Sequence, residues 1–453
     1  MEAILQFIKW CLIVVFGLAV LWAVVALTHW LPRPNAVERQ SLAILAQPPT
    51  QATGQRNAFA AIWLLGYDIP AGEREQVAAR DVARFAAASP AQRRQFVTSA
   101  QGRYPYDDLS ELSNAALCVP VDDDCLGKIR THADATRAAL AAHALTLAQM
   151  QALGGFDHYR GGFRTADHEL VAPIAGPAWL LESDAALRFV DGEQVEGLRR
   201  ACAAASTWRM LALRSDSFSQ QIVASGQFIT DAQLAAAMLA QMPVDAPAPA
   251  QCTQAFAVVP DPVHGACDAA KVAFAGFNAF LQDTATAPGM AQHLSTFSRW
   301  RIRALFNPQA ATALAAPQFA SYCTDDAGVN QQAGRLDHAR SAWALGWQQA
   351  GFNPFGVVLA QVSNPRGWRP PAQMRARLRD VVRMATLMRA ALAWRAHAMT
   401  PPQAGLPADV AYDAKARVFR SARDLPPANA PGTLLVPLPG SRLDPRKLST
   451  NAP

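Results

Sequence analysis

The sequence predicts a mainly α-helical protein with an N-terminal transmembrane helix and an irregular, disulfide-braced helical domain behind it. Three observations predict this fold class. The run from Trp10 to Leu27 carries no charge, six of the seven cysteines follow it, and helical periodicity dominates the remainder of the 453 residues. A hydrophobic content of 51% with only 17% charged residues excludes wholesale disorder. A net charge of +6 is too small for a dedicated nucleic-acid binder, so we expect no nucleic-acid partner.

The apolar run predicts a single membrane span over residues 10–30, with residues 1–9 in the cytoplasm. Trp10 and Trp30 fall where amphipathic rings are enriched at the two membrane interfaces. A cleaved signal peptide is the alternative, with Val24-Val25-Ala26 as its cleavage site. The apolar run is, however, longer than the 7–15 residues that are typical of a signal peptide.

The cysteines predict the side of the membrane on which the domain lies. An even number after the membrane segment fits an oxidising compartment, so we expect a single-pass inner-membrane protein with residues 31–453 in the periplasm. Proximity in the sequence favours Cys118–Cys125 and Cys252–Cys267, which leaves Cys202–Cys323. Fifteen pairings are formally open, and ordinary buried thiols are the alternative to any of them.

Residues 31–55, rich in proline, predict a linker, and residues 56–424 predict one large helical domain. Asp124 is a plausible N-cap for a helix of about 25 residues. The clearest amphipathic helix spans 371–398, with apolar residues at steps of three and four from Met374 onward. Other helices are predicted at 57–65, 71–87, 90–101, 192–214, 231–242, 266–282, 289–306 and 331–350.

The end of the chain predicts a small β-hairpin followed by a tail. AYDAKARVF (411–419) alternates weakly and TLLVPL (433–438) is apolar, so these two segments can pair as strands. We assign residues 425–453 to a separate C-terminal region, the proline-rich hairpin and tail.

No motif with a geometry that dictates chemistry occurs in the chain, so we expect no catalytic residue, no metal and no cofactor. The stretch most similar to a site is GGFDHYRGGFRTADHE (154–169), which holds Asp157, His158, His168 and Glu169. Its paired glycines would let the backbone approach a ligand closely. A glycine-rich loop with surface histidines is the simpler interpretation, because the spacing matches no known ligand geometry.

Two charged features indicate a binding partner. Asp122, Asp123 and Asp124 lie between Cys118 and Cys125, so a bridge would present them on a short rigid loop. The alternative is that they favour the positive end of the following helix.

The second feature is basic. From residue 351 onward the chain has 15 Lys+Arg against 5 Asp+Glu, and Arg375, Arg379 and Arg383 share one face of the predicted helix 371–398. This charge could steer an acidic partner or contact anionic lipid headgroups. A solvated arginine face is the alternative.

Four segments carry a resemblance to a known group of proteins. They are RNAFAAIWLLGYDIP (56–70), Cys118-x6-Cys125 followed by Leu126, AGFNPFGVVLAQVSNP (350–365), and AYDAKARVF (411–419). The chain resembles the membrane-anchored or exported helical proteins of the Xanthomonas–Stenotrophomonas type, which look like periplasmic immunity partners of antibacterial effectors delivered by type IV or type VI secretion. The resemblance covers about a third of the chain. It brings no catalytic residue, and the Pro-Asp-Asp-rich loop and the GGFDHYRGGF stretch have no counterpart in it.

The leading hypothesis is therefore a membrane-anchored periplasmic binding protein, an immunity protein that neutralises a secreted antibacterial effector. Its partners would be the inner membrane and that effector. A cell-envelope enzyme centred on Asp157, His158 and Glu169 is the first alternative. A structural or assembly subunit of an envelope complex is the second.

Overall fold

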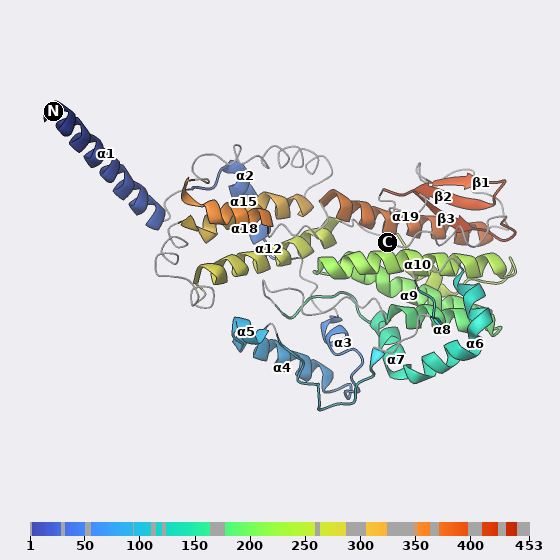
Figure 1. The fold of residues 1–453 in the computed structure, drawn as a ribbon. Helices are drawn as coiled ribbons and strands as arrows, with labels where there is room; N and C mark the ends of the chain where they lie inside the picture. The colour runs from blue at the N-terminus through green and yellow to red at the C-terminus, as the bar shows by residue number, and fades with distance from the viewer. Residues whose placement is uncertain are drawn as a thin grey trace. The chain divides into compact units, whose positions relative to one another are not determined.

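The computed structural model confirms the predicted fold class: helices dominate, and a small antiparallel sheet lies near the C-terminus (Figure 1). It describes residues 2–28, 32–49, 56–93, 95–109, 115–119, 124–163, 177–258, 263–286, 305–323, 349, 351–362, 371–396, 410–424 and 432–441. The chain divides into two compact units. The first unit comprises 1–49, 164–168 and 270–371, and the second comprises 50–163, 169–269 and 372–453.

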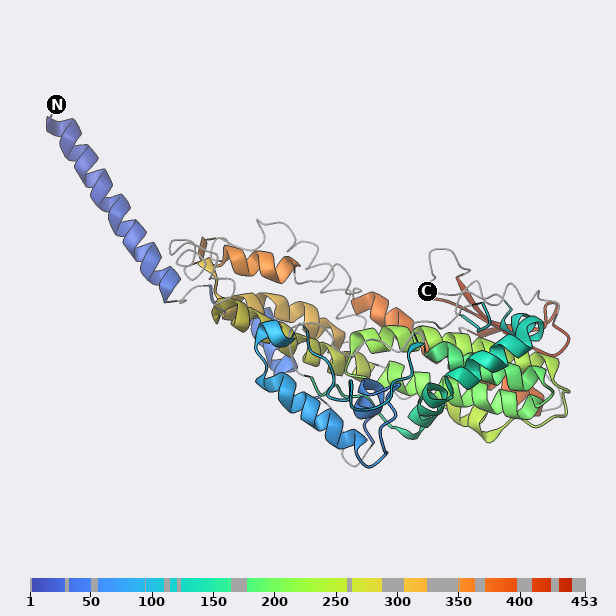
Figure 2. The same ribbon diagram turned by 60° about the horizontal axis from the view of Figure 1, so that its bottom comes forward.

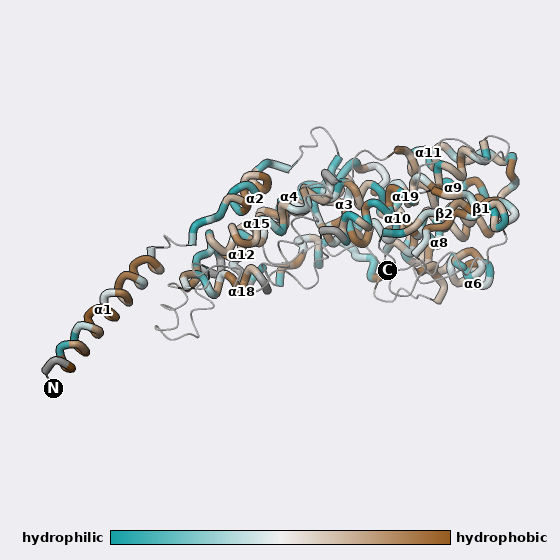
Figure 3. Tube along the Cα trace, turned by 90° about the horizontal axis from the view of Figure 1, so that it is seen from above, coloured by the Kyte–Doolittle hydropathy of each residue, from teal (hydrophilic) through white to brown (hydrophobic). Residues whose placement is uncertain are grey.

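Helix α1 (Glu2–Leu27) is the apolar N-terminal helix, and it begins earlier than the predicted span of 10–30. Figure 3 shows it brown, and therefore hydrophobic, over most of its length. Only 6% of the residues in the apolar window of Ile4–Leu27 are buried. In α10 (Phe218–Gln241), the other described helix with the length and composition of a membrane span, 67% of the window is buried. We therefore interpret α10 as a core helix and α1 as a signal sequence or an anchor.

The first unit also contains α2 (Ala36–Ala46), α15 (Pro308–Ala320), the 3-10 turn η3 (Ser321–Cys323), α18 (Pro354–Val362) and most of α12 (Val263–Thr286). α15 packs against both α2 and α18, and phenylalanines from α12 and α15 fill the core between them. The predicted linker 31–55 thus carries a packed helix. A capping box stabilises the start of α2. Asn35 Oδ1 accepts a hydrogen bond from the Glu38 backbone N–H, and the Glu38 carboxylate accepts one from the Asn35 backbone N–H.

The second unit is built on α8 (Ala178–Val190), α9 (Gln194–Arg214) and α10, which pack together and lie side by side in Figures 1 and 2. Alanines allow these helices to approach closely, and Trp208 and Phe228 are fully buried between them. Among the described residues, this unit also contains α3 (Phe59–Trp63), α4 (Arg74–Ala87), α5 (Pro90–Arg93), α6 (Cys125–Ala142), α7 (Ala144–Ala152), the 3-10 turn η2 (Leu153–Gly155), α11 (Ala250–Ala255) and α19 (Pro371–Ala396).

Several predicted helix boundaries were wrong. α10 begins at Phe218 rather than near Thr230, because Ser217 caps it and the polar Gln and Ser side chains of its first turns are buried rather than in a loop. The long helix after Asp124 divides at His143 into α6 and α7, and the helix at 90–101 is reduced to α5. The predicted helices at 289–306 and 331–350 fall almost entirely outside the described residues.

The sheet contains β1 (Val410–Asp413), β2 (Val418–Ala422) and β3 (Thr433–Pro437), in the order β1-β2-β3 with both pairs antiparallel. The predicted strand 411–419 is therefore itself a hairpin, and 433–437 adds a third strand. The chain reverses because the Asp413 carboxylate accepts hydrogen bonds from the Lys415 and Ala416 backbones, both at 3.0 Å. β3 lies against α10.

Candidate functional site

The predicted acidic loop is closed by a disulfide and held at both ends. Cys118 and Cys125 are bonded, with their Cα atoms 5.2 Å apart, as the sequence predicted. The buried Cys118 backbone donates to Ser183 Oγ at 2.9 Å, which fixes the loop to α8. Asp124 is exposed and its Oδ1 accepts from the Gly127 backbone at 2.8 Å, so it is the N-cap of α6. Asp122 and Asp123 lie outside the described residues, and their contact with a partner stays a prediction.

The other two predicted disulfides were wrong. Cys202 on α9 is bonded to Cys252 on α11, with their Cα atoms 4.8 Å apart, so neither Cys252–Cys267 nor Cys202–Cys323 forms. Cys267 and Cys323 are also disulfide-bonded, and Cys11 is a free, exposed thiol. The packing of α11 on α9 brings together two residues 50 apart in sequence, which proximity along the chain does not predict. The apolar N-terminal helix and the disulfides together indicate a secreted or envelope location.

The described part of the glycine-rich stretch, residues 154–163, runs between two other backbone segments. The Asp157 backbone donates to the Arg56 carbonyl at 3.0 Å, and the Arg56 backbone donates to Asp157 Oδ2 at 2.9 Å. On the other side, the Tyr159 backbone donates to the Arg214 carbonyl at 3.1 Å. The Asp157 side chain therefore holds two segments of the fold together.

Gly162 is one of the paired glycines, and close packing explains why this position is a glycine. A Cβ atom at this position would lie 2.6 Å from the Phe59 ring and 2.7 Å from Val82 Cγ2, closer than real Cβ contacts. Glycine is required here because protein side chains already occupy the space. Packing thus accounts for this glycine, and a close approach of a ligand to its backbone stays a prediction.

His158 is buried, with 7% of its surface exposed, and its Nδ1 has no hydrogen-bond partner in the structure. Burial lowers the pKa of His158, the neighbouring Arg160 lowers it further, and Asp157 opposes them. The imidazole is therefore neutral at pH 7. His168 and Glu169, the other members of the predicted cluster, lie outside the described residues.

An acidic site that sequence reasoning missed lies beside this stretch. Asp216 Oδ1 accepts from the Gly161 backbone at 3.0 Å, and the Arg160 guanidinium lies 3.8 Å from Asp268 Oδ2. Burial raises the pKa of Asp216 to about 6, and the negative charge of Asp268 adds to this effect. Asp216 can therefore exchange a proton near neutral pH. No sequence signal marked it, because the pairing of residues 159–161 with 214–216 is set by tertiary structure.

An aspartate–histidine pair elsewhere has a structural explanation. Asp107 Oδ1 lies 2.7 Å from His143 Nδ1, and its Oδ2 accepts from the Thr146 hydroxyl at 2.6 Å and from the Thr146 backbone at 3.3 Å. Thr146 lies in the first turn of α7, so Asp107 caps this helix from a remote loop. These hydrogen bonds lower the pKa of Asp107 against the effect of burial, which is the larger single influence and acts in the opposite direction.

The arginine face of α19 is occupied by contacts within the protein. Arg379 and Arg383 both form ion pairs with Asp424, which follows β2, and Arg383 Nη1 lies 3.6 Å from Asp380 Oδ1. Arg375 is buried, with 4% of its surface exposed. The described contacts of this face thus join α19 to the sheet, and a contact with a partner stays a prediction.

Arg395, also on α19, donates hydrogen bonds to backbone carbonyls at and just after the C-terminal end of α10. Its guanidinium donates to the Leu239 carbonyl at 3.0 Å, to the Ala246 carbonyl at 3.1 Å and to the Pro243 carbonyl. Carbonyls at a helix C-terminus lack partners within the helix, and a buried cation is favoured there. Part of the basic C-terminal charge is therefore structural.

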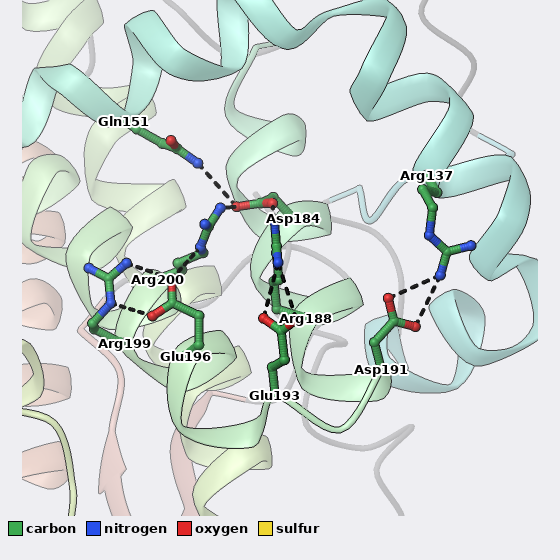
Figure 4. A network of polar contacts seen from close by, with 9 residues as sticks. All are labelled: Arg137, Gln151, Asp184, Arg188, Asp191, Glu193, Glu196, Arg199 and Arg200. Carbon is green, nitrogen blue, oxygen red and sulfur yellow. Dashed lines mark hydrogen bonds and ion pairs between the residues drawn. The ribbon is translucent and has the colours of Figure 1, made fainter.

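Figure 4 shows a network of ion pairs and hydrogen bonds that joins α7, α8 and α9. Asp184 accepts from Gln151 Nε2 at 3.1 Å and from Arg200, and Arg200 Nε donates to Glu196 at 2.7 Å. Arg199 donates to both oxygens of Glu196 at 2.6 Å. These bonds lower the pKa of Glu196 to about 2. We interpret the network as a structural connection between helices.

Asp231 on α10 is a fully buried carboxyl. Neither of its oxygens has a hydrogen-bond partner, and its exposed fraction is 0%. Burial raises the pKa of Asp231 well above its ordinary value against the opposing effect of the Trp208 indole, so the interior favours the neutral acid. It lies within the helical core.

Within the described ranges, no three His, Cys, Asp or Glu side chains lie close enough together to hold a metal ion. Comparisons of the chain with protein-family models, curated proteins and solved structures gave no match. The functional hypothesis therefore depends on the residues and their geometry.

Proposed function

We propose that this chain is a membrane-anchored binding protein of the bacterial cell envelope. In this proposal α1 spans the inner membrane once and the chain that follows it lies in the periplasm. The observation that carries it is the combination of an exposed, apolar α1 with disulfide bonds in the chain that follows. An exposed apolar helix is unfavourable in water, and structural disulfides persist in oxidising compartments.

Binding is favoured over catalysis by the roles that the described charged groups already have. Asp107 caps α7, Arg395 satisfies the end of α10, and the glycine at 162 accommodates Phe59. Each of these three groups thus has a packing or capping role. These roles support a rigid scaffold whose function depends on its surface.

The disulfide-closed loop between Cys118 and Cys125 is the proposed contact surface. Its bridge, the Cys118–Ser183 hydrogen bond and the Asp124 cap fix both ends of the loop. A loop held in this way loses little conformational entropy on binding. The aspartates between the cysteines give the loop negative charge, so its partner would be basic.

At its most specific, the proposal is immunity: the partner is a secreted antibacterial effector, and binding blocks its action. The resemblance of residues 56–70, 118–126, 350–365 and 411–419 supports this specific form. An inhibitor of this kind needs an affinity near the nanomolar range, which corresponds to about −12 kcal/mol.

The test is a competition between a deletion strain and its parent when both are attacked by effector-armed siblings. Immunity predicts that the deletion strain dies and that the wild-type gene rescues it. Rescue should fail, or weaken strongly, for the double variant Asp122→Lys/Asp123→Lys. The matched control Glu75→Lys/Asp134→Lys reverses two exposed charges in the same unit and should rescue fully. Survival of the deletion strain would contradict the immunity hypothesis.

A cell-envelope enzyme is the second candidate, favoured by one observation, the carboxyl of Asp216 with a pKa near 6 beside the Arg160–Asp268 pair. A group that titrates near working pH is suited to proton transfer. Asp216→Asn should then abolish function in vivo although it does not lower the urea midpoint. Normal rescue by this variant would count against an enzyme at this position.

A further inference from the structure

Helix α1 makes a specific contact with a distant part of the chain. The Trp22 indole donates to the Gly351 carbonyl at 3.2 Å, and its ring stacks on Phe352 with centroids 6.3 Å apart. Most of the remaining α1 side chains are exposed. Residues 351 and 352 directly precede α18, so this helix begins beside α1.

The position of Trp22 along α1 sets the depth of this contact in a bilayer. The apolar stretch Ile4–Leu27 has 24 residues, or about 36 Å at 1.5 Å per residue, and the hydrocarbon core is about 30 Å thick. If the core is centred on this stretch, its edge lies about 3 Å before Leu27 and Trp22 lies about 4–5 Å inside it. Gly351 and Phe352, which contact Trp22, therefore reach the edge of the hydrocarbon.

α18 has the composition expected of a segment at this depth. The sequence from Ser341 to Pro365 contains no Asp, Glu, Lys or Arg, and Arg340 and Arg366 flank it. Phe355 and Val358, three residues apart on α18, are 41% and 53% exposed. Large apolar side chains exposed together on an uncharged helix are costly in water.

The opposite face of α18 is held by protein. Val357 and Ala360 are each 9% exposed, and the helix packs against α15. The buried Asn353, just before α18, accepts from the Asn307 backbone at 2.9 Å and donates to Gln349 Oε1 at 3.2 Å. The start of α18 is thus fixed to the N-terminus of α15, and its exposed face has a defined direction.

We propose that α18 is a second membrane contact: Phe355 and Val358 insert into the acyl chains of the leaflet that surrounds the C-terminal end of α1. This inference rests on the proposed role of α1 as a membrane anchor. α18 has nine residues and is too short to span a bilayer, so it lies in the interface. The contact of Trp22 with Gly351 and Phe352 favours lipid over a protein partner, because it places the start of α18 beside the helix that this proposal puts in the membrane.

The test uses the full-length protein in phosphatidylcholine–phosphatidylglycerol vesicles, labelled at one thiol with an environment-sensitive fluorophore. The six cysteines other than Cys11 are disulfide-bonded, so only one thiol reacts in each variant. The native protein carries the label at Cys11 within α1. Cys11→Ser/Val358→Cys reports on α18, and Cys11→Ser/Val195→Cys is the control, since Val195 lies on α9 and is 50% exposed. Phe355→Cys replaces Val358→Cys if the latter does not fold.

We expect the labels at positions 11 and 358 to be blue-shifted and quenched by lipids that carry a nitroxide on the acyl chain, and the label at 195 to be unaffected. If position 358 behaves like position 195 while position 11 is quenched, the inference is overturned and the anchor stands. If position 11 is not quenched, the anchor itself fails and the inference falls with it. A blue shift at 358 without quenching by lipid would assign the surface to a second copy or a protein partner, and would also overturn the inference.

Discussion

Replacing Asp216 by asparagine is expected to stabilise the protein at neutral pH. Burial raises the pKa of this carboxyl from 3.8 to about 6, so its charge is unfavourable in the folded state. Each pKa unit corresponds to about 1.4 kcal/mol, which gives a cost of ionisation of about 3 kcal/mol. This is an upper bound, because Asp216 is only partly shielded from solvent. Asparagine removes the charge and keeps the oxygen that accepts from the Gly161 backbone.

The pH dependence follows from the direction of the shift. The folded state binds the proton of Asp216 more tightly than the unfolded state, so this group's contribution to the free energy of unfolding falls as pH rises from 3.8 to about 6. Below this window Asp216→Asn should match the wild type, and above it the variant should be more stable. Carboxyls with lowered pKa values, such as Asp81 and Asp424, affect both proteins equally and cancel in the difference.

Urea unfolding of the full chain in detergent, from about pH 4 to about pH 8, measures this difference. Asp134→Asn is the matched control, because the Asp134 side chain is fully exposed. Its stability relative to the wild type should change little across the series. If the difference between Asp216→Asn and the wild type is the same at every pH, the assignment of a raised pKa to Asp216 is refuted.

Three further predictions concern stability. Gly162→Ala should cost about 1–3 kcal/mol in urea unfolding, because its Cβ would meet the Phe59 ring, while Gly72→Ala, with open space around it, should cost little. Replacing both cysteines of the Cys118–Cys125 bridge by serine should cost about 2–3 kcal/mol, since the bridge closes a short loop, and an unchanged melting temperature would contradict this. A double-mutant cycle on Arg379 and Asp424 should give a coupling of about 1 kcal/mol, and no coupling would remove this pair as a link between α19 and the sheet.

Local signals in the sequence were sufficient where the interaction itself is local. The Asp124 cap is made to a backbone group three residues away, and the Cys118–Cys125 bridge spans seven, so both were predicted correctly. The apolar run of α1 and the short C-terminal strands were also recognised, since composition and alternation identify them.

Other features depend on which elements pack together, and the sequence does not contain this information in a local form. Cys202 pairs with Cys252 because α11 packs on α9. Asp216 acquires its raised pKa from burial beside a segment more than 50 residues earlier in the chain. Arg375 looks like a surface residue in the helical pattern but is buried. Amphipathic spacing identifies a face of a helix and not what covers it.

The interleaved order of the two units has a consequence for how the chain is made. The first unit needs residues 1–49 and 270–371, and the second needs segments on both sides of that insertion. During synthesis and export from the N-terminus, neither unit has all its parts until residue 371 has emerged, and the second also awaits α19 and the sheet. The Leu239 carbonyl at the end of α10 lacks its hydrogen bond from Arg395 until that residue has been synthesised. A chain that stops before α19 therefore leaves the second unit incomplete with its hydrophobic core open, so premature termination is expected to yield aggregation or proteolysis rather than a smaller stable protein.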